Sequence, residues 1–179
     1  MASSAIERLD AAFLDIMKRA DELGLDGRIS AIGPVIEETF DLAFMARAAL
    51  GRAWEDLSAA DRERWVETFS KYTIWRLADR FSAYSGQSFV IEGHRPASRQ
   101  TLIVETRLIR PSQDDVSLHY RMREKDAGWK VVDVYAKGTI SEVAMRRAEY
   151  AEVLRAGGFE HLITSVSALV TKASDLARR

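Results

Sequence analysis

The sequence predicts an α+β fold in which helices at both ends of the chain pack on an antiparallel meander of about four strands. Apolar residues recur at steps of three and four up to about Tyr84 and again beyond Thr139, as they do on one face of a helix. Between these regions the apolar period is two, which is typical of strands. Because helices and strands fall in separate runs, the pattern favours the α+β class over alternating βαβ units.

Three helices are expected before the strands. The first ends at Gly24 and Gly27, because glycine is a common helix terminator. The second begins at Pro34, since a first helical turn does not use the N–H that proline lacks. The third begins at Ser58, where Asp61 completes a capping-box pair. Their expected ranges are 5–23, 34–50 and 58–84.

The central part of the chain is expected to form four strands joined by turns at hairpin spacing. The clearest strand, Val116–Glu124, alternates apolar and polar residues, which indicates one buried and one solvated face. The last strand, Trp129–Lys137, is apolar on both faces, so we expect it to be covered on both sides. The expected ranges are 89–92, 101–109, 116–124 and 129–137.

Two helices are expected to close the chain. Thr139 and Glu142 form a second capping-box pair at the start of the first of them. Gly157 and Gly158 are expected to end that helix. The final helix is expected over residues 159–176.

The composition argues against several function classes. The 179 residues are 47% hydrophobic and 30% charged, which fits one domain over 1–179, structured over about 5–176. A net charge of −1 argues against nucleic-acid binding, which needs a basic face. There is no cysteine, which rules out disulfides and thiolate chemistry. No apolar run reaches the ~20 residues that span a bilayer, and the opening MASSAIERLD lacks a signal-peptide pattern.

Neither a metal site nor a cofactor is indicated. His94, His119 and His161 have no second ligand at metal-binding spacing. Asp133 is the one candidate acid or base, because an apolar strand favours the protonated form of a carboxyl group. Together with Tyr135 it would suit an NTF2-like small-molecule enzyme or binding domain. The alternative is that Asp133 accepts hydrogen bonds and holds its strand to a helix.

Several motifs occur in a recognisable order. The turn Ala49-Leu50-Gly51 ends a helix, a Ser58-capped helix follows, and Tyr84-Ser85-Gly86 leads into the first strand. WKVVDV then precedes a glycine, a helix and a Gly-Gly pair. Over about residues 5–175 this arrangement resembles the periplasmic lipid-carrier family typified by MlaC, also known as toluene-tolerance proteins. The stretch 138–163 is most similar to its hopanoid-associated branch, HpnM.

The resemblance implies a non-enzymatic shuttle. Such a protein would hold the tails of a phospholipid or hopanoid-type lipid in an apolar pocket between sheet and helices. It also implies a periplasmic location, with the signal peptide trimmed from this chain, and transient contact with membrane-bound lipid-transport complexes of the inner and outer membranes. No cofactor, nucleic-acid partner or membrane span is implied, and we expect a monomer.

We expect the pocket lining to come from the buried sheet face and from the helices that cover it. The expected lining residues are Phe44, Met45, Phe69, Tyr72, Leu102, Val104, Leu118, Tyr120, Val132, Val134, Ile140, Val143 and Leu162. Four arginines are expected to meet a partner or a phosphate head group: Arg121, Arg123, Arg146 and Arg147. On the fourth strand, Val132 and Val134 are expected to face the lipid and Asp133 to face away from it.

Overall fold

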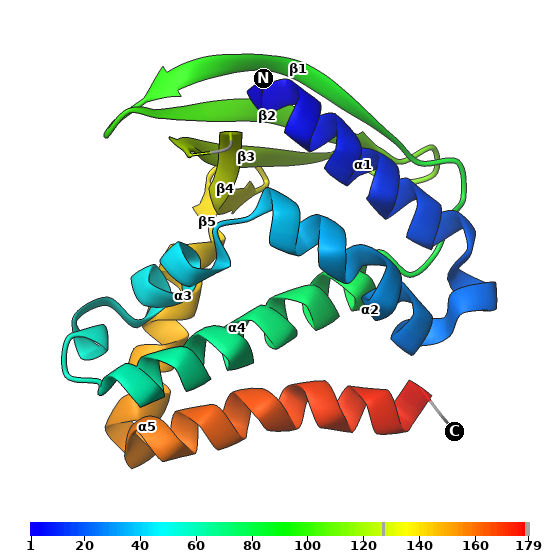
Figure 1. The fold of residues 1–179 in the computed structure, drawn as a ribbon. Helices are drawn as coiled ribbons and strands as arrows, with labels where there is room; N and C mark the ends of the chain where they lie inside the picture. Colours follow the sequence, from blue (N-terminus) through cyan, green and yellow to red (C-terminus); the bar gives the residue numbers. More distant parts are fainter. Residues whose placement is uncertain (127, 178–179) are drawn as a thin grey trace.

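The computed structural model describes residues 1–126 and 128–177 of the chain. It has the predicted α+β fold: a five-stranded antiparallel sheet in the order β1-β2-β3-β4-β5 forms one layer, and the helices pack beneath it in the view of Figure 1. The strands are β1 (Ser88–Ala97), β2 (Thr101–Ile109), β3 (Val116–Lys125), β4 (Gly128–Ala136) and β5 (Ile140–Ser141). The helices are α1 (Ala2–Lys18), α2 (Ala20–Thr39), α3 (Leu42–Leu50), the 3-10 helix η1 (Gly51–Trp54), α4 (Ala59–Arg80) and α5 (Glu142–Ala177).

A β-bulge in β4 changes which of its side chains share a face. Tyr120 of β3 pairs with Val134, and Met122 pairs with Val131, so Val132 has no partner on β3. Val131 and Val134 therefore both lie on the helix-facing side. The expected pairing of Val132 with Val134 on one face does not hold, because an extra residue in a strand shifts the alternation by one position.

The first helices divide at different points from those expected. The helical conformation is interrupted at Gly24, whose φ of 58° and ψ of −173° fall in a region that is essentially restricted to glycine. Gly27 and Pro34, expected at helix boundaries, lie inside α2. A proline within a helix costs about 3 kcal/mol. The complete burial of the neighbouring Ile32 and Ile36 offsets that cost.

The second expected helix is in fact two helices, because the backbone becomes extended at Phe40. Asp41 then caps α3: its Oδ1 atom accepts a hydrogen bond from the backbone N–H of Phe44 at 3.2 Å. The backbone N–H of Asp41 donates to the carbonyl oxygen of Val131 at 2.9 Å. The junction between α2 and α3 is thereby attached to β4.

The predicted cap by Ser58 at the start of α4 is confirmed, whereas the carboxylate of Asp61 accepts a hydrogen bond from the Ser58 hydroxyl and not from the backbone N–H expected of a capping box. The Oγ atom of Ser58 accepts a hydrogen bond from the backbone N–H of Asp61 at 3.1 Å, and its hydroxyl lies 2.8 Å from the carboxylate of Asp61. The helix ends at Arg80, earlier than expected, because Phe81 turns inward. There the ring of Phe81 stacks on Phe13 of α1, with 4.0 Å between the ring centroids.

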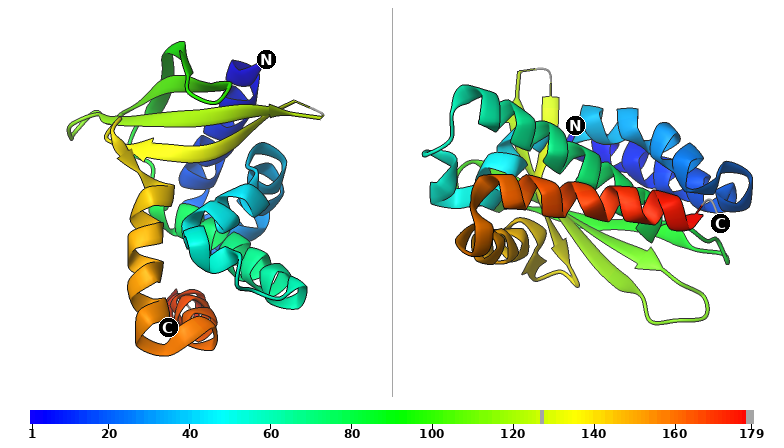
Figure 2. Two further views of the ribbon diagram at one scale, coloured as in Figure 1. Left: turned by 90° about the vertical axis from the view of Figure 1, so that its left-hand side faces the viewer. Right: turned by 90° about the horizontal axis from the view of Figure 1, so that it is seen from below.

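A serine caps the start of α5, and a glycine allows the bend within it. The Oγ atom of Ser141 accepts a hydrogen bond from the backbone N–H of Ala144 at 3.0 Å and caps the helix. The expected Thr139 cap does not form, because the next two residues pair with β4 as β5. The predicted break is confirmed at Gly158, where φ is 74° and ψ is −168°. The first half of α5 descends from the sheet, and the second half runs beside α4 (Figure 2).

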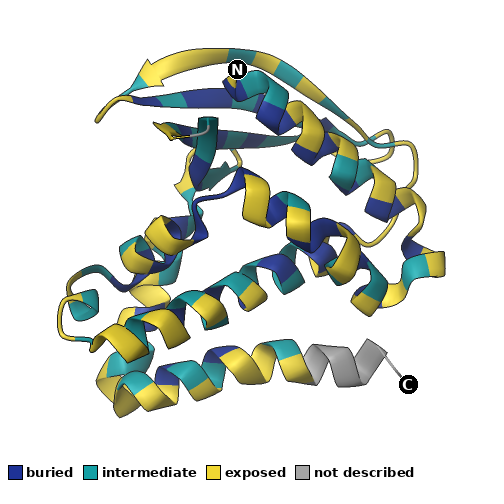
Figure 3. Cartoon of the chain, viewed as in Figure 1, coloured by how far each residue is buried: buried dark blue, intermediate teal, exposed yellow. Residues whose placement is uncertain are grey.

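Buried residues lie on the sides of the sheet and of the helices that face one another (Figure 3). Trp65 of α4 is fully buried, and its Nε1–H donates to the carbonyl oxygen of Ala46 in α3 at 2.9 Å. The ring of Tyr150 in α5 meets Trp65 edge-on, with centroids 5.1 Å apart. Three helices are thus held together at one aromatic contact.

Candidate functional site

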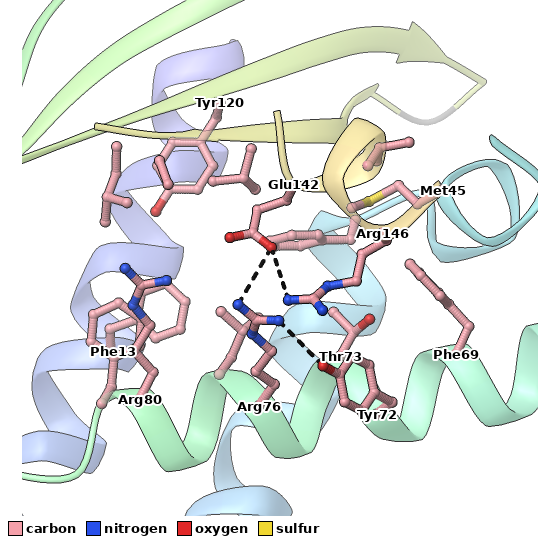
Figure 4. Close-up of a pocket in the computed structure, with 17 residues that line it drawn as sticks. Phe13, Met45, Phe69, Tyr72, Thr73, Arg76, Arg80, Tyr120, Glu142 and Arg146 are labelled. Carbon is pink, nitrogen blue, oxygen red and sulfur yellow. Dashed lines mark hydrogen bonds and ion pairs between the residues drawn. The ribbon is translucent and has the colours of Figure 1, made fainter. Parts of the chain in front are cut away.

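A cavity lies between the helix-facing side of β3 and β4 and the helix α4 (Figure 4). The volume of this cavity is about 90 Å³. This volume is below the range of roughly 300–1,000 Å³ that is typical of ligand pockets. The lining residues are Phe13, Phe40, Met45, Phe69, Tyr72, Thr73, Arg76, Leu77, Arg80, Phe81, Leu118, Tyr120, Val134, Ala136, Glu142, Val143 and Arg146.

Most of the cavity wall is apolar. β3 and β4 contribute Leu118, Tyr120 and Val134, and the stacked rings of Phe13 and Phe81 lie beside them. A wall of this kind can cover the apolar part of a ligand without leaving buried polar groups unpaired. Its chemistry therefore suits a ligand with a hydrocarbon part.

Charged side chains of α4 and α5 meet at the same cavity (Figure 4). The Oε2 atom of Glu142 lies 3.6 Å from Nη2 of Arg76 and 3.6 Å from Nη2 of Arg146. Arg76 also donates to the hydroxyl of Tyr72 at 3.2 Å, and the guanidinium of Arg146 lies 5.6 Å from the centroid of that ring. Burial opposes the charge on Arg76, but the Tyr72 hydrogen bond and the Glu142 charge outweigh it and raise the pKa of Arg76.

Arg80 is the remaining charged lining residue. Its side chain extends from the last turn of α4 toward Tyr120 (Figure 4). Burial is the main reason that the pKa of the Tyr120 hydroxyl is raised; the charge of Asp10 adds to the effect and the charge of Arg80 opposes it. Within the part of the chain that the structure describes, no carboxylate forms an ion pair with Arg80.

The structure brings together more than half of the side chains that the sequence predicted for the lining. Those that lie in the cavity wall are Met45, Phe69, Tyr72, Leu118, Tyr120, Val134 and Val143. Arg146, predicted to meet a head group, also lies there.

Three of the predicted lining residues lie on the sheet but away from the cavity. Leu102 and Val104 belong to β2, one strand farther along the sheet, where Val104 is fully buried in the core. Val132 occupies the bulge of β4. Alternation identified the buried face of these strands, but it carries no information on which strands border a cavity.

The other three predicted lining residues that lie outside the cavity wall are in β5, α5 and α3. Ile140 is 45% exposed in β5, and Leu162 is fully buried in the second half of α5. Phe44 is 38% exposed, and its ring packs under the guanidinium of Arg123, 4.4 Å from the ring centroid. Each of these positions depends on tertiary packing that a helical period does not determine.

Three of the four arginines predicted to meet a partner or head group lie outside the cavity. Arg121 donates to the Oγ1 atom of Thr101 at 2.9 Å, and Arg147 donates to the carbonyl oxygen of Ala48 at 2.8 Å. Arg123 pairs with the carboxylate of Asp41 at 2.9 Å. Their guanidinium groups therefore hold structural contacts.

Sequence reasoning missed Arg76 and Arg80, along with seven other lining residues: Phe13, Phe40, Thr73, Leu77, Phe81, Ala136 and Glu142. A signal for the two arginines was present. With Phe69, Tyr72 and Thr73 they follow the three- and four-residue steps of one stripe on α4. Arginines that continue an apolar stripe lie on the same face as the core contacts.

Asp133 has the structural role that the sequence left open. Its carboxylate accepts hydrogen bonds from the backbone N–H groups of Val134 at 2.8 Å and Val143 at 3.1 Å, and from the hydroxyl of Ser141. These contacts attach β4 to the first turn of α5. Neither Asp133 nor Tyr135 lines the cavity, so the arrangement expected of an NTF2-like site is not formed.

The fold and the cavity define a class of α+β protein in which a curved sheet and a helical layer enclose a largely apolar hollow. The chain belongs to the MlaC family, since the family model described as "MlaC protein" matches residues 7–168. Proteins of this family are periplasmic, and membership indicates a protein that is not an enzyme.

The structure is also similar to that of a phospholipid-binding protein from Ralstonia solanacearum, determined in complex with a phospholipid. The TM-score is 0.83 and the sequences are 17% identical, with 97% of this chain and 98% of that chain covered. No curated protein matches the sequence. None of the described helices has the length and apolar character needed to cross a membrane.

Proposed function

We propose that this protein binds a lipid, with the hydrocarbon part in the cavity and the polar part at the charged side chains of α4 and α5. The observation that carries the proposal is the composition of the cavity, whose wall is largely apolar and whose charged residues are gathered on two helices. Membership of the MlaC family supports it, as does the fold shared with a phospholipid-binding protein.

The energetics of lipid transfer explain why such a cavity is needed. Two acyl tails contain ~30 methylene groups, and exposing each to water costs ~0.8 kcal/mol, which amounts to on the order of 24 kcal/mol. A protein that moves a lipid through water must offset most of this free-energy cost with apolar contacts to the tails. The lipid must not be more stable in the protein than in a bilayer, because it would then not be released.

The size of the cavity bears on the kind of cargo. The volume of the cavity is about 90 Å³, which is below the roughly 300–1,000 Å³ of typical ligand pockets. Loading a lipid with two tails therefore requires the sheet and α4 to separate. A small cavity favours flexible acyl chains, which can enter one at a time, over the rigid ring system of a hopanoid-type lipid, which is the second candidate cargo.

The proposed biological role is a periplasmic shuttle that acts as a monomer. It would receive lipid from one membrane-bound transport complex and deliver it to another, with transient contact at each. The periplasmic location of the family supports this role.

Lipid extraction and native mass spectrometry of the purified protein test the proposal. We expect close to one lipid per chain. Val134→Phe places a larger side chain in the cavity and is expected to reduce the bound lipid severalfold. Val90→Phe is the matched control, because Val90 is 47% exposed on β1 and does not line the cavity.

Two results would contradict the proposed function. One is a wild-type protein that carries no lipid and takes none up from vesicles. The other is equal lipid retention by the Val134→Phe and wild-type proteins when both are folded by circular dichroism, which would place the lipid elsewhere.

A further inference from the structure

Asp10 is a buried carboxyl group that the proposed function does not use. It lies on the face of α1 that carries the buried residues Ile6, Leu9 and Phe13, and it is itself only 5% exposed. Among the described residues, its Oδ1 atom has no hydrogen-bond partner and no cation forms an ion pair with it. Because a buried charge normally needs a partner, the ionised form of Asp10 lacks the support that it requires.

Two neighbours connect Asp10 to the cavity. Phe13 follows it by three residues, about one turn later on the same face of α1, and lines the cavity (Figure 4). Tyr120 of β3 also lines the cavity, and the charge of Asp10 is, after burial, the second cause that raises the pKa of the Tyr120 hydroxyl. Asp10 therefore lies behind the part of the cavity wall to which these two rings belong.

The charged groups that face this part of α1 do not neutralise Asp10. On α1 itself, Glu7 lies about one turn away, and its charge opposes the ionisation of Asp10. From α4, Arg80 is exposed to solvent, and its charge acts on the hydroxyl of Tyr120. From β1, His94 lies on the helix-facing side of the sheet and is exposed.

The remaining elements packed on α1 offer no counter-charge either. In α2, Glu38 pairs with Arg8 at 3.3 Å on the surface, and the buried guanidinium of Arg28 donates to the carbonyl oxygens of Ala20 at 3.3 Å and Ala78 at 2.9 Å. The helix-facing residues of β2 and of the middle of β4 are uncharged: Leu102, Val104, Thr106, Leu108, Val131 and Val134. The protonation state of this carboxyl therefore depends mainly on how polar its surroundings are.

Filling the cavity changes those surroundings. A volume of about 90 Å³ has room for a few water molecules. A hydrocarbon chain beside Phe13 and Tyr120 takes the place of water and makes this side of α1 less polar. Since a less polar environment disfavours the charged form of a carboxyl group, a bound chain favours protonated Asp10. Coupling between two binding events is reciprocal, so protonation of Asp10 favours binding of the chain by the same factor.

We propose that Asp10 couples lipid binding to proton uptake, so that the cavity holds a hydrocarbon chain more tightly when this carboxyl group is protonated than when it is ionised. The inference rests on the proposed function and adds to it a control by pH. The pKa of Asp10, raised to about 7 mainly by burial, places the transition near neutrality. A ligand that raises this pKa further binds best below about pH 7 and less well as the pH rises through that value.

The test measures the affinity of a short-chain phosphatidylglycerol for the full chain, freed of lipid, by calorimetry. The titrations run from about pH 5.5 to about pH 8.5, which brackets the titration of Asp10, and the phosphodiester of the lipid keeps one charge throughout. We expect binding about three- to tenfold weaker at the upper end, since a further pKa shift of about one unit corresponds to at most tenfold. Titrations near neutral pH in buffers of different ionisation enthalpy are expected to show uptake of a fraction of a proton per lipid.

Variants connect the pH dependence to named residues. Asp10→Asn cannot ionise, so we expect it to bind at every pH about as tightly as the wild type does at low pH, without proton uptake. Glu7→Gln removes a charge that opposes ionisation, so the loss of affinity is expected to begin at lower pH. His94→Gln is the control for the histidine on this side of the sheet. Glu37→Gln is the control for an exposed charge on α2. Both are expected to keep the wild-type pH dependence.

The outcomes separate this inference from the proposed function. If the lipid binds at no pH, the proposed function fails. If the wild type binds equally over the whole range, takes up no proton, or binds more tightly at high pH, lipid binding stands and the coupling is overturned. The same holds if Asp10→Asn keeps the wild-type pH dependence or if His94→Gln abolishes it. Should Asp10→Asn not fold, the proton uptake of the wild type and the shift in Glu7→Gln decide the result.

Discussion

Asp41 and Arg123 join the α2–α3 junction to the third strand: an Nη2 atom of Arg123 lies 2.9 Å from Oδ2 of Asp41. Lys125 approaches the same oxygen at 3.0 Å, and the carboxylate side chain is only 4% exposed. Burial opposes its ionisation, but the hydrogen bonds from Lys125 and from the Phe44 N–H, with the charge of Lys125, outweigh that effect. The pKa of Asp41 is therefore lowered.

We predict that Asp41→Ala lowers the free energy of unfolding by about 2–4 kcal/mol, because a helix cap is worth about 1 kcal/mol and a charge-assisted hydrogen bond about 1.5–3 kcal/mol. Asp41→Asn keeps the cap and is expected to cost about half as much. Urea denaturation at pH 7 measures both. Since the pKa of Asp41 is lowered on folding, its contribution is present above the unfolded-state pKa and is lost as the pH falls. Equal costs for both variants would show that the cap contributes nothing, and an Asp41→Asn variant as stable as the wild type would show that the ion pairs contribute nothing.

Asp10 gives the opposite pH dependence. It is 5% exposed on α1, and among the described residues its Oδ1 atom has no hydrogen-bond partner. Burial, helped by the charge of Glu7, raises the pKa of Asp10 to about 7. The folded protein therefore favours the protonated form, and this contribution to stability is fully present below about pH 4 and lost as the pH rises to about 7.

We predict that Asp10→Asn removes a decline in the free energy of unfolding that totals on the order of 4 kcal/mol between pH 4 and pH 7. The variant should be more stable than the wild type at pH 8. Glu37→Gln, an exposed change on α2, is the control and should leave the pH dependence as it is. If the free energy of unfolding of Asp10→Asn declines with pH as that of the wild type does, a group other than Asp10 is responsible for the decline.

The third prediction concerns Gly158, where the helical conformation of α5 is interrupted. A β-carbon at this position would meet no heavy atom within 4 Å, so any cost of Gly158→Ala comes from the backbone conformation. We expect a loss of about 1–3 kcal/mol in the free energy of unfolding. Gly93→Ala is the control, because φ there is not positive and the nearest atom is 4.0 Å away. If the two variants behave alike in thermal denaturation, the break does not need a glycine.

The strands were predictable where the pattern is local. β2 has the expected bounds, and β3 differs from expectation by one residue, since alternation along a strand reports its two faces directly. β1 extends to Ala97, beyond the expected end at Glu92, because pairing with β2 continues there: Ala97 lies opposite Thr101. β5 was not predictable, since two residues form a strand only through their pairing with β4.

The site was less predictable than the fold, for a related reason. Tyr120 and Val134 were identified because they lie on a buried face, which periodicity reveals. Val132 was placed wrongly because a bulge is invisible to a period of two. Arg80 was missed because an arginine at the end of a helix is usually solvated; Arg80 is indeed exposed, and it borders the cavity only because of the position of the sheet above α4.

The first half of α5 acts as a strut between the two layers of the molecule. Its sixteen residues, Glu142 to Gly157, extend about 24 Å at 1.5 Å per residue, from the Asp133 contacts at the sheet to the break beside α4. One added turn would move the α4 layer about 5.4 Å from the sheet without changing any lining side chain. The length of this helix therefore contributes to the spacing between the sheet and α4, and so to the size of the cavity between them.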